Sequence, residues 1–301
     1  MGIVVIGTTF VDVKGYPFGS FIPRGRNAGR VIETHGGVTR NIAEDIANAG
    51  FAATYVSMVD ESGLSTDIMN RLAQHGCNVD YVGRAENGLG MWLAIFNEAG
   101  DVVASISRRP DTEGIGRILV EKGDEIVAQA DSVCVEFDID APILERVLAL
   151  AERHGKKVYA PVTNMTIACE RRDLLRRVAC LVCNHQEAAK LFSRSNDATS
   201  PEKVRSVLPQ ELARVGLESM VVTMGAQGSV FAQVDGESGW CPAREVEVVD
   251  TTGAGDAFFA GVAIGLTKGK SLAESCAVGT KLAASAISVE DNVCERLLLK
   301  I

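Results

Sequence analysis

The sequence predicts one α/β domain built on a mainly parallel sheet, with a small β-sheet lid. Short apolar segments alternate with helical patterns along most of the 301 residues. Two strand-like segments, 91–96 and 102–107, interrupt this alternation and flank a turn that contains Gly100. A segment rich in Gly and Pro, 13–33, lacks the pattern of a core helix. We therefore expect the α/β domain at 1–12, 34–88 and 109–301 and the lid, which would exclude water from a site, at 13–33 and 89–108.

The individual elements follow from local patterns. Residues 2–7 form a short apolar run typical of a buried strand. A turn at 35–41 leads into a helix over 42–49 that Gly50 ends. The further strands are expected at 52–59, 131–136, 157–161, 179–184, 219–224, 229–232 and 245–249, and the further helices at 65–75, 142–154, 187–192, 201–216, 257–266 and 271–288.

The composition excludes several classes of function. The net charge is -9 and the basic residues are scattered, which argues against nucleic acid polymers and anionic membranes as partners. The eight Cys lie mostly in apolar segments and no apolar run reaches membrane-spanning length, so we expect a reduced, cytoplasmic protein. Cys180 and Cys183 form a Cys-x-x-Cys, but strand residues three apart face opposite sides, which favours a structural role over metal binding.

The stretch from Asp250 to Gly261 is the strongest candidate for chemistry. It places a turn of small residues between an expected strand and a buried helix. Gly253, Ala254 and Gly255 let the backbone approach a ligand, and the first amides of a helix can bind an anion. The carboxylate of Asp256 stands beside this anion site, where it can take a proton from an incoming hydroxyl.

Three other interpretations apply to this stretch. Asp and Gly are common at helix starts, so the turn could be only a helix cap. A dinucleotide-binding fingerprint would need Gly where Phe258 stands. A Walker A loop would need Gly-x-x-x-x-Gly-Lys-Ser/Thr, which the sequence lacks.

Further polar residues follow other expected strands. In a parallel sheet the carboxyl ends of the strands share one edge, where ligands bind. The residues expected near that edge are Asp12, Glu136, Asn184, Thr223 and Asp256. Each of them could instead be a turn or cap residue.

Taken together, the motifs resemble those of the ribokinase-like (PfkB) carbohydrate kinases over nearly the whole chain. Asp250–Phe258 resembles the C-terminal signature of that family, Gly36-Gly37-x-x-x-Asn41-x-Ala43 the N-terminal signature, Asn184–Glu187 an Asn-x-x-Glu motif and Thr223–Gly228 a Thr-x-Gly-x-x-Gly nucleotide turn. Four motifs in the same order make the resemblance specific.

The resemblance implies a three-layer α/β/α sandwich with a lid and an ATP-dependent phosphotransferase that acts on a hydroxyl of a sugar or nucleoside. Asp256 would be the base, with the anion hole at Gly253, Ala254 and Gly255. The acceptor would be held by Asp12, Gly36, Gly37, Arg40, Asn41 and Glu136. The nucleotide would be bound by Asn184, Thr223, Gly225 and Gly228, Mg²⁺ through water by Asn184 and Glu187, and a monovalent cation such as K⁺ by Asp250 and Thr252.

Local matches at 11–16, 36–43 and 236–240 resemble pseudouridine kinases most. The leading hypothesis is therefore phosphorylation of the 5'-hydroxyl of pseudouridine. Ala160 stands where the family often has Asp, and 161–166 lacks a Lys typical of pseudouridine kinases. The alternatives are a kinase for ribose, fructose, 2-keto-3-deoxygluconate, adenosine or inosine, and a non-catalytic sensor on the same fold. A small exposed lid has edges that invite pairing, so we also expect a homodimer through the lid.

Overall fold

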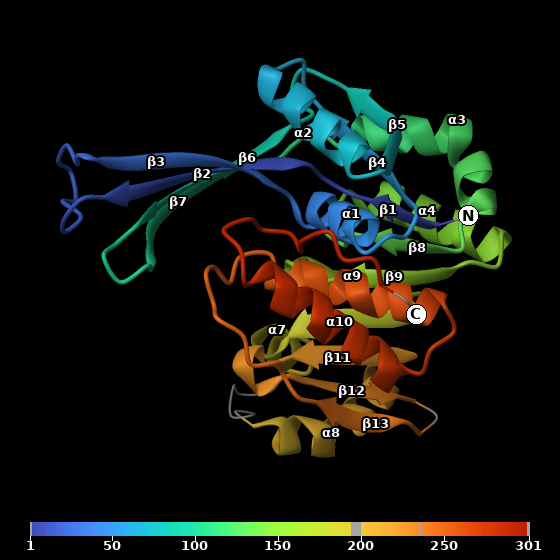
Figure 1. Cartoon of the computed structure of the whole chain (residues 1–301). Coiled ribbons are helices and arrows are strands. Elements are labelled where there is room, and N and C mark those ends of the chain that lie inside the picture. The colour runs from blue at the N-terminus through green and yellow to red at the C-terminus, as the bar shows by residue number, and fades with distance from the viewer. Residues whose placement is uncertain (1, 194–199, 235, 300–301) are drawn as a thin grey trace.

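The computed structural model describes residues 2–193, 200–234 and 236–299 and contains two β-sheets (Figure 1). The larger sheet has nine strands in the order β13-β12-β11-β10-β9-β8-β1-β4-β5. Their bounds are β1 Ile3–Ile6, β4 Ala53–Val59, β5 Cys77–Arg84, β8 Ser132–Val135, β9 Lys157–Pro161, β10 Cys180–Asn184, β11 Ser219–Thr223, β12 Ser229–Gln233 and β13 Ser238–Cys241. Only β12 pairs antiparallel with both neighbours among these strands, so the carboxyl ends of most strands meet at one edge.

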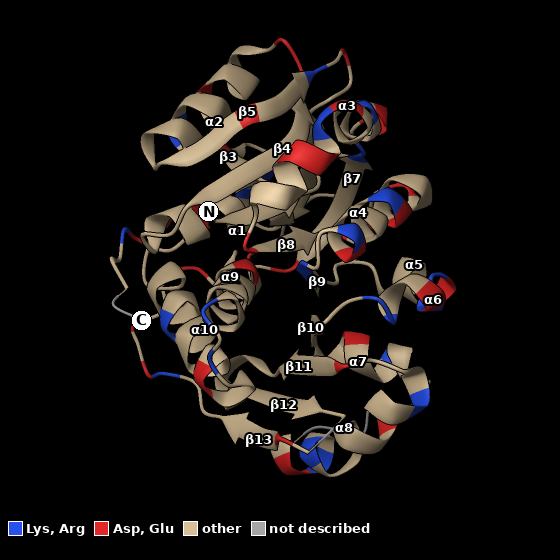
Figure 2. Ribbon diagram, turned by 90° about the vertical axis from the view of Figure 1, so that its right-hand side faces the viewer, with Lys and Arg blue, Asp and Glu red and all other residues tan. Residues whose placement is uncertain are grey.

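Helices cover both faces of the large sheet (Figure 2). One face carries α1 (Val38–Asn48), α2 (Gly63–Gln74), α9 (Ala254–Thr267) and α10 (Leu272–Ala286). The other carries α3 (Glu113–Gln129), α4 (Ala141–Arg153), α5 (Met165–Glu170), α6 (Arg172–Leu175), α7 (His185–Leu191) and α8 (Pro201–Val215). The three-layer α/β/α architecture expected from the sequence is confirmed.

Each face of the sheet has its own apolar core. The cores are separate because successive strand residues point to opposite faces. Cys180 belongs to the core under α9 and α10, whereas Cys183 belongs to the core under the other helices. All eight cysteines are free thiols, and the opposite directions of Cys180 and Cys183 agree with a structural role.

The smaller sheet forms an arm that projects from the body (Figure 1). Its strands are β2 (Phe10–Pro17), β3 (Gly29–Gly36), β6 (Gly90–Phe96) and β7 (Val102–Arg108), in the order β3-β2-β6-β7. Both the hairpin and the segment without a helical pattern contribute to it. We call these four strands the lid. Residues 10–12 and 34–36, expected in the α/β domain, are part of its strands.

The expected strand at 245–249 is wrong. Residues 242–249 are not in a strand, and Val246, Val248 and Val249 are exposed. Val249 N donates to Ile287 O at 2.8 Å, but this contact is not continued as a ladder. The alternation of Val and Glu fits a strand pattern, yet no neighbouring strand among the described residues pairs with it.

Several elements were not expected from the sequence. They are β5, β13, α3, α5 and α6. The helix α3 contains three Gly, at 114, 116 and 123, which weaken a helical pattern. A Cβ on Gly114 or Gly123 would lie 2.3 Å from Met58 Sδ or 2.6 Å from Leu150 Cδ1, so a larger residue at either position requires that side chain to shift. Within the described ranges, no helix is long and apolar enough to cross a membrane.

Candidate active site

A cavity of about 730 Å³ opens between the lid and the carboxyl edge of the large sheet. Six parts of the chain line it: the turn from β1 into β2, the start of α1, the end of β7 with the loop into α3, the loop after β8, the loop after β9, and the start of α9. The lining residues are Thr8, Phe10, Asp12, Gly37, Val38, Asn41, Ser107, Arg109, Pro110, Asp111, Thr112, Glu136, Asp138, Asp140, Thr163, Asn164, Thr252, Gly253 and Asp256. Segments far apart in the sequence therefore share one site.

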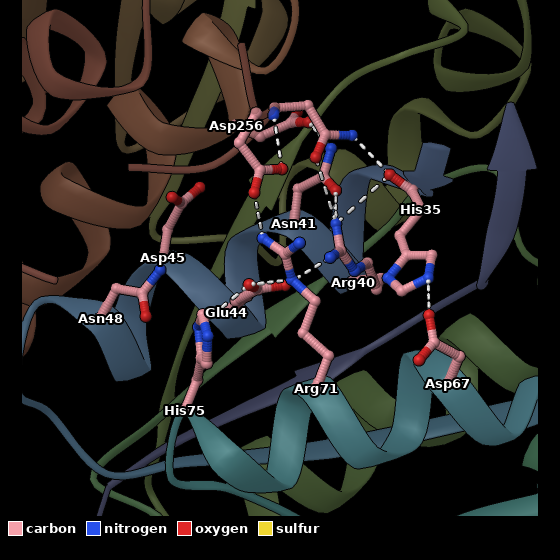
Figure 3. Close-up of polar contacts among 12 residues, drawn as sticks. His35, Arg40, Asn41, Glu44, Asp45, Asn48, Asp67, Arg71, His75 and Asp256 are labelled. Carbon is pink, nitrogen blue, oxygen red and sulfur yellow. Dashed lines mark hydrogen bonds and ion pairs between the residues drawn. The ribbon is translucent and has the colours of Figure 1, made fainter. Parts of the chain in front are cut away.

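Asp256 lies in the first turn of α9 and faces the cavity. Its Oδ2 accepts a hydrogen bond of 2.7 Å from Asn41 Nδ2 (Figure 3). Enclosure by protein raises the pKa of Asp256 to about 7, and the carboxylates of Glu136 and Asp12 act in the same direction. Asn41 and Arg40 oppose this rise without cancelling it. A carboxylate with this pKa can accept a proton from a hydroxyl near neutral pH.

The turn before α9 packs closely against the main chain at Asn292. Gly253 has φ 78°, and a Cβ on it would lie 1.9 Å from Asn292 O, so only glycine fits. Asp250 Oδ1 accepts from Thr252 N at 2.9 Å and Thr252 Oγ1 at 2.8 Å, which fixes the turn. The amides at the start of α9 therefore form a rigid group of donors beside Asp256.

Glu136 follows β8 and is held by the turn after β1. Its Oε2 accepts from Thr8 N at 3.0 Å and Thr8 Oγ1 at 2.9 Å, and Thr39 Oγ1 donates to it at 3.3 Å. Burial raises its pKa, and Asp138 adds to the rise. Glu136 is thus a fixed acceptor in the wall of the cavity.

Asp12 and Gly37 line the cavity under the lid, whereas Gly36, also expected to contact the acceptor, packs against Asp12 and does not line it. Burial raises the pKa of Asp12, whereas Lys14 and Arg40 lower it. A Cβ on Gly36 would lie 2.7 Å from both carboxylate oxygens of Asp12. Gly37 has φ 98°, and its Cβ would lie 2.7 Å from Thr8 O. The two glycines therefore allow the start of α1 to pack against β2.

Arg40, expected to contact the acceptor, does not line the cavity. It is fully buried behind Asn41, and its Nη1 donates to Asn41 Oδ1 at 2.6 Å. The Gly-Gly-x-x-x-Asn motif does not show which side of the helix each residue occupies, so the sequence could not separate Arg40 from Asn41.

The residues expected to bind nucleotide lie further along the same sheet edge, outside the lining of this cavity. Asn184 and Glu187 cap α7: Asn184 Oδ1 accepts from Glu187 N at 2.9 Å, and Glu187 Oε2 accepts from Asn184 N at 2.7 Å. Thr223 ends β11, and Gly225 and Gly228 have φ 59° and 87°. Burial raises the pKa of Glu187, and the charge of Asp138, which lines the cavity, adds to the rise.

Several lining residues were not expected from the sequence. Thr8, Asp138, Thr163 and Asn164 each follow a strand, and the rule that found Glu136 would have found them. Arg109, at the junction of the lid and α3, had no such signal. It is the single cationic side chain among the described lining residues, which include six carboxylates. Its Nη2 donates to Asp138 O at 2.9 Å.

An aromatic strip extends from the cavity along the lid. Trp92 pairs with Asp12 on one side and Ser107 on the other, so its side chain shares their face of the sheet. Trp92 meets Phe96 edge to face at 6.3 Å, and Phe96 stacks on Tyr16 at 4.9 Å. The face that bears Asp12 thus offers flat apolar surface beside the cavity.

Comparison with known proteins gives a consistent result. The family model of the pfkB family carbohydrate kinases matches residues 2–292. The guanosine-inosine kinase of Exiguobacterium acetylicum is 31% identical over 292 residues, which cover 96% of this chain and 95% of that protein. The pseudouridine kinase of Escherichia coli is 27% identical over 290 residues, which cover 96% and 91%.

The fold is also similar to solved structures. Arabidopsis thaliana ribokinase, solved with ribose and ATP, superposes with a TM-score of 0.84 at 21% identity, covering 98% of this chain and 96% of that one. The agreement extends over the body and the lid together, because nearly all of both chains is covered.

Proposed function

Because the chain belongs to the pfkB family of carbohydrate kinases, we propose that it is an ATP-dependent nucleoside kinase that phosphorylates the 5'-hydroxyl of its substrate. Family membership makes it a sugar or nucleoside kinase, a phosphotransferase with an alcohol group as acceptor. The resemblance inferred from the four motifs is thereby confirmed. The observation that carries the choice of a nucleoside is the position of Trp92 between Asp12 and Ser107.

The catalytic part of the proposal rests on Asp256 and the turn before it. Asp256 takes the proton of the acceptor hydroxyl as that oxygen attacks the terminal phosphorus of ATP, and the bond to the departing phosphate oxygen breaks. The amides around Gly253, Ala254 and Gly255 stabilise the charge on the transferred group. Positioning and charge stabilisation are the main contributions a protein makes to this reaction.

The acceptor is held on the lid side of Asp256. Asp12, Asn41 and Glu136 all line the cavity and offer hydrogen-bonding groups for the sugar hydroxyls. The nucleobase of the acceptor then lies against the aromatic strip, where stacking is favourable for any nucleobase. A free sugar would leave this strip unused.

The part of the site around Asp138, Asn184 and Glu187 is proposed to bind ATP together with its metal ion. Asp138 Oδ1 is buried and lacks a hydrogen-bond partner among the described residues, and the charge of Asp138 raises the pKa of Glu187. Such hard oxygen donors fit Mg²⁺, which when bound neutralises phosphate charge. In the described ranges no group of three or more His, Cys, Asp or Glu could hold a metal alone, which suits an ion carried mainly by the nucleotide. We propose Asn184, Thr223, Gly225 and Gly228 as nucleotide contacts.

Arg109 completes the proposed site. As the cationic side chain of an otherwise acidic cavity, it is the group suited to bind the transferred phosphoryl group. Asp250 and Thr252 remain our proposal for a monovalent cation such as K⁺.

Two nucleoside classes are candidates. Guanosine and inosine are favoured by the 31% identity to a guanosine-inosine kinase. Pseudouridine is favoured by the local matches at 11–16, 36–43 and 236–240 and by the 27% identity to a pseudouridine kinase. A panel of guanosine, inosine, pseudouridine, uridine, adenosine, ribose, fructose and 2-keto-3-deoxygluconate with ATP decides between them. Preference for a free sugar would refute the nucleoside proposal.

We also propose that two copies of the chain associate through the lid. The face of the lid opposite Asp12 exposes Val31, Leu93 and Ile106 to solvent. Apolar side chains on an arm with free edges favour pairing with a second copy. Sedimentation of the purified chain over a range of concentrations tests this, and a monomer throughout would contradict it.

A further inference from the structure

A buried ionic network joins α1 to α2 and to the C-terminal segment (Figure 3). Arg40 and Glu44, both fully buried, form an ion pair one turn apart on α1. Glu44 Oε1 also accepts from Arg71 Nε at 2.7 Å and lies 3.0 Å from His75 Nδ1. Arg71 in turn pairs with Asp291. Buried charges are tolerated when they are paired and hydrogen bonded, and the ion pair with Glu44 is the contact of this network that holds the Arg40 guanidinium directly.

Arg40 determines which end of the Asn41 amide faces Asp256. A guanidinium can only donate hydrogen bonds, whereas an asparagine side chain has one accepting and one donating end. Arg40 Nη1 donates to Asn41 Oδ1 at 2.6 Å, so Asn41 Nδ2 is left to donate to Asp256 at 2.7 Å. With the amide turned over, Asn41 Oδ1 would face the Asp256 carboxylate and repel it.

The same guanidinium reaches the turn before α9. Arg40 Nη1 donates to Asn292 Oδ1 at 3.3 Å, and Asn292 Nδ2 donates to His35 O at 2.5 Å. The main-chain oxygen of Asn292 is the atom that excludes a Cβ at Gly253. Asn292 therefore supports the turn from behind, and Arg40 holds Asn292.

We propose that Arg40 is a positioning residue that fixes the Asn41 amide against Asp256 and supports the Gly253 turn through Asn292. This inference rests on the proposed function, in which Asp256 is the base. The competing explanation is that the network only fastens α1 to its neighbours. Arg71 has that fastening role, since it contacts Glu44 and Asp291 and lines no part of the cavity.

The pH dependence of turnover separates the two explanations. The groups that act on Asp256 are Asn41, Arg40 and Asp45 from α1, Glu136 from the loop after β8 and Asp12 from β2. Arg40 is the one cation among these groups, and both its charge and its hold on Asn41 favour the ionised base. Loss of the guanidinium therefore moves the acidic limb of kcat to higher pH.

The experiment compares Arg40→Met, Arg40→Lys and Arg71→Met, with kcat and KM measured over a pH range of about 5.5 to 9 that brackets the acidic limb. We expect Arg40→Met to lower kcat at neutral pH by at least about tenfold and to move the acidic limb upward by about half a pH unit or more. Arg40→Lys keeps the charge, so its limb stays near that of the wild type. One ammonium cannot hold Asn41, Asn292 and Glu44 together, so we expect its kcat to fall about threefold. Arg71→Met is expected to lower Tm but to leave kcat within about twofold and the limb unmoved.

The proposal is overturned if folded Arg40→Met and Arg71→Met have the same kcat and the same acidic limb. If Arg40→Met does not fold, an Arg40→Lys protein with wild-type kcat overturns it instead. A wild type that phosphorylates no acceptor refutes the proposed function and not this inference. In that case a ¹³C titration of the Asp256 carboxyl, assigned with Asp256→Asn, tests it without turnover. An Asp256 pKa that is equal in the wild type and Arg40→Met would contradict it.

Discussion

Asn41 Nδ2 donates a 2.7 Å hydrogen bond to Asp256 Oδ2 across 215 residues of sequence. The bond joins the start of α1 to the start of α9, which carry the two glycine-containing turns of the site. The turn proposed to bind the acceptor and the turn proposed to bind the phosphoryl group thereby become one site. The position of the proton acceptor thus depends on both halves of the fold.

The ionisation of Asp256 is expected to set the pH dependence of turnover. The general base must be ionised to act, and burial raises the pKa of Asp256 to about 7. We therefore expect kcat at saturating substrates to rise with pH up to about 7 and to fall about tenfold per unit below that. Asn41→Ala, which removes a hydrogen bond to the ionised form, should move this limb to higher pH. An acidic limb near the ordinary pKa of an aspartate would contradict the assignment.

Arg109 is expected to act on the transferred group. Arg109→Met should lower kcat by about 10- to 100-fold with a smaller change in the KM of the acceptor, because it removes positive charge from that group. Arg117 is a matched control, since its side chain is equally exposed, at 58%, and is also in an ion pair, with Glu113, but it does not line the cavity. Arg117→Met should retain wild-type kcat. Equal activity of the two variants would remove Arg109 from the reaction.

Trp92 tests the nucleoside part of the proposal. Loss of a stacking partner costs about 1–3 kcal/mol per base, so Trp92→Ala should lower kcat/KM for nucleosides by about tenfold or more. The rate with ribose should change little, because ribose has no base. Val120→Ala shortens an exposed apolar side chain on α3, outside the lid, and is the control. An equal loss for ribose and nucleosides would show that Trp92 supports only the lid.

The ionisation of Asp45 is expected to make the stability of the fold depend on pH. Asp45 is fully buried, its Oδ1 accepts from Cys294 N at 2.7 Å, and its Oδ2 has no partner among the described residues. Burial raises its pKa well above the ordinary range, so the folded chain binds this proton more tightly than the unfolded chain does. Stability is therefore lost as pH rises from about 4 toward the folded pKa. Asp45→Asn cannot ionise and keeps the acceptor for Cys294.

The measurement for Asp45 is thermal unfolding of the wild type and Asp45→Asn at two pH values, about 5 and about 8, both above the ordinary pKa of an aspartate. The Tm of Asp45→Asn relative to the wild type should be greater at the higher pH. Glu145→Gln is the control, because Glu145 is an exposed carboxylate on α4 and its loss should not change the pH dependence of Tm. A difference for Asp45→Asn that does not change with pH would contradict the raised pKa.

The sequence predicted the structure best at positions where the backbone geometry allows few residue types. Gly37 and Gly253 have positive φ and lie against backbone, so their motifs indicated the two turns correctly. The apolar strands were also identified, because burial on both faces leaves a continuous apolar run. The order of these strands and turns placed four predicted site residues around one cavity: Asp12, Asn41, Glu136 and Asp256.

The remaining features depend on partners that local patterns do not show. The segment 245–249 alternates like a strand but pairs with no described strand. Arg40 and Asn41 are neighbours in one motif, yet one is buried in an ion pair and the other faces the cavity. The position of Arg109 in the cavity depends on how the lid and the loop into α3 lie over the acidic edge of the sheet, which no local pattern shows.

The most direct test of the central claim is the rate of 5'-phosphate formation from ATP and guanosine, inosine, pseudouridine or ribose, measured with the wild type and with Asp256→Asn. We expect kcat/KM for at least one nucleoside to exceed that for ribose by about tenfold or more, as the loss of base stacking implies. Asp256→Asn should lower kcat by at least about 10²-fold while ATP binding is retained, since a general base contributes about that much. A wild type that prefers ribose, or an Asp256→Asn protein with near-normal turnover, would contradict the account.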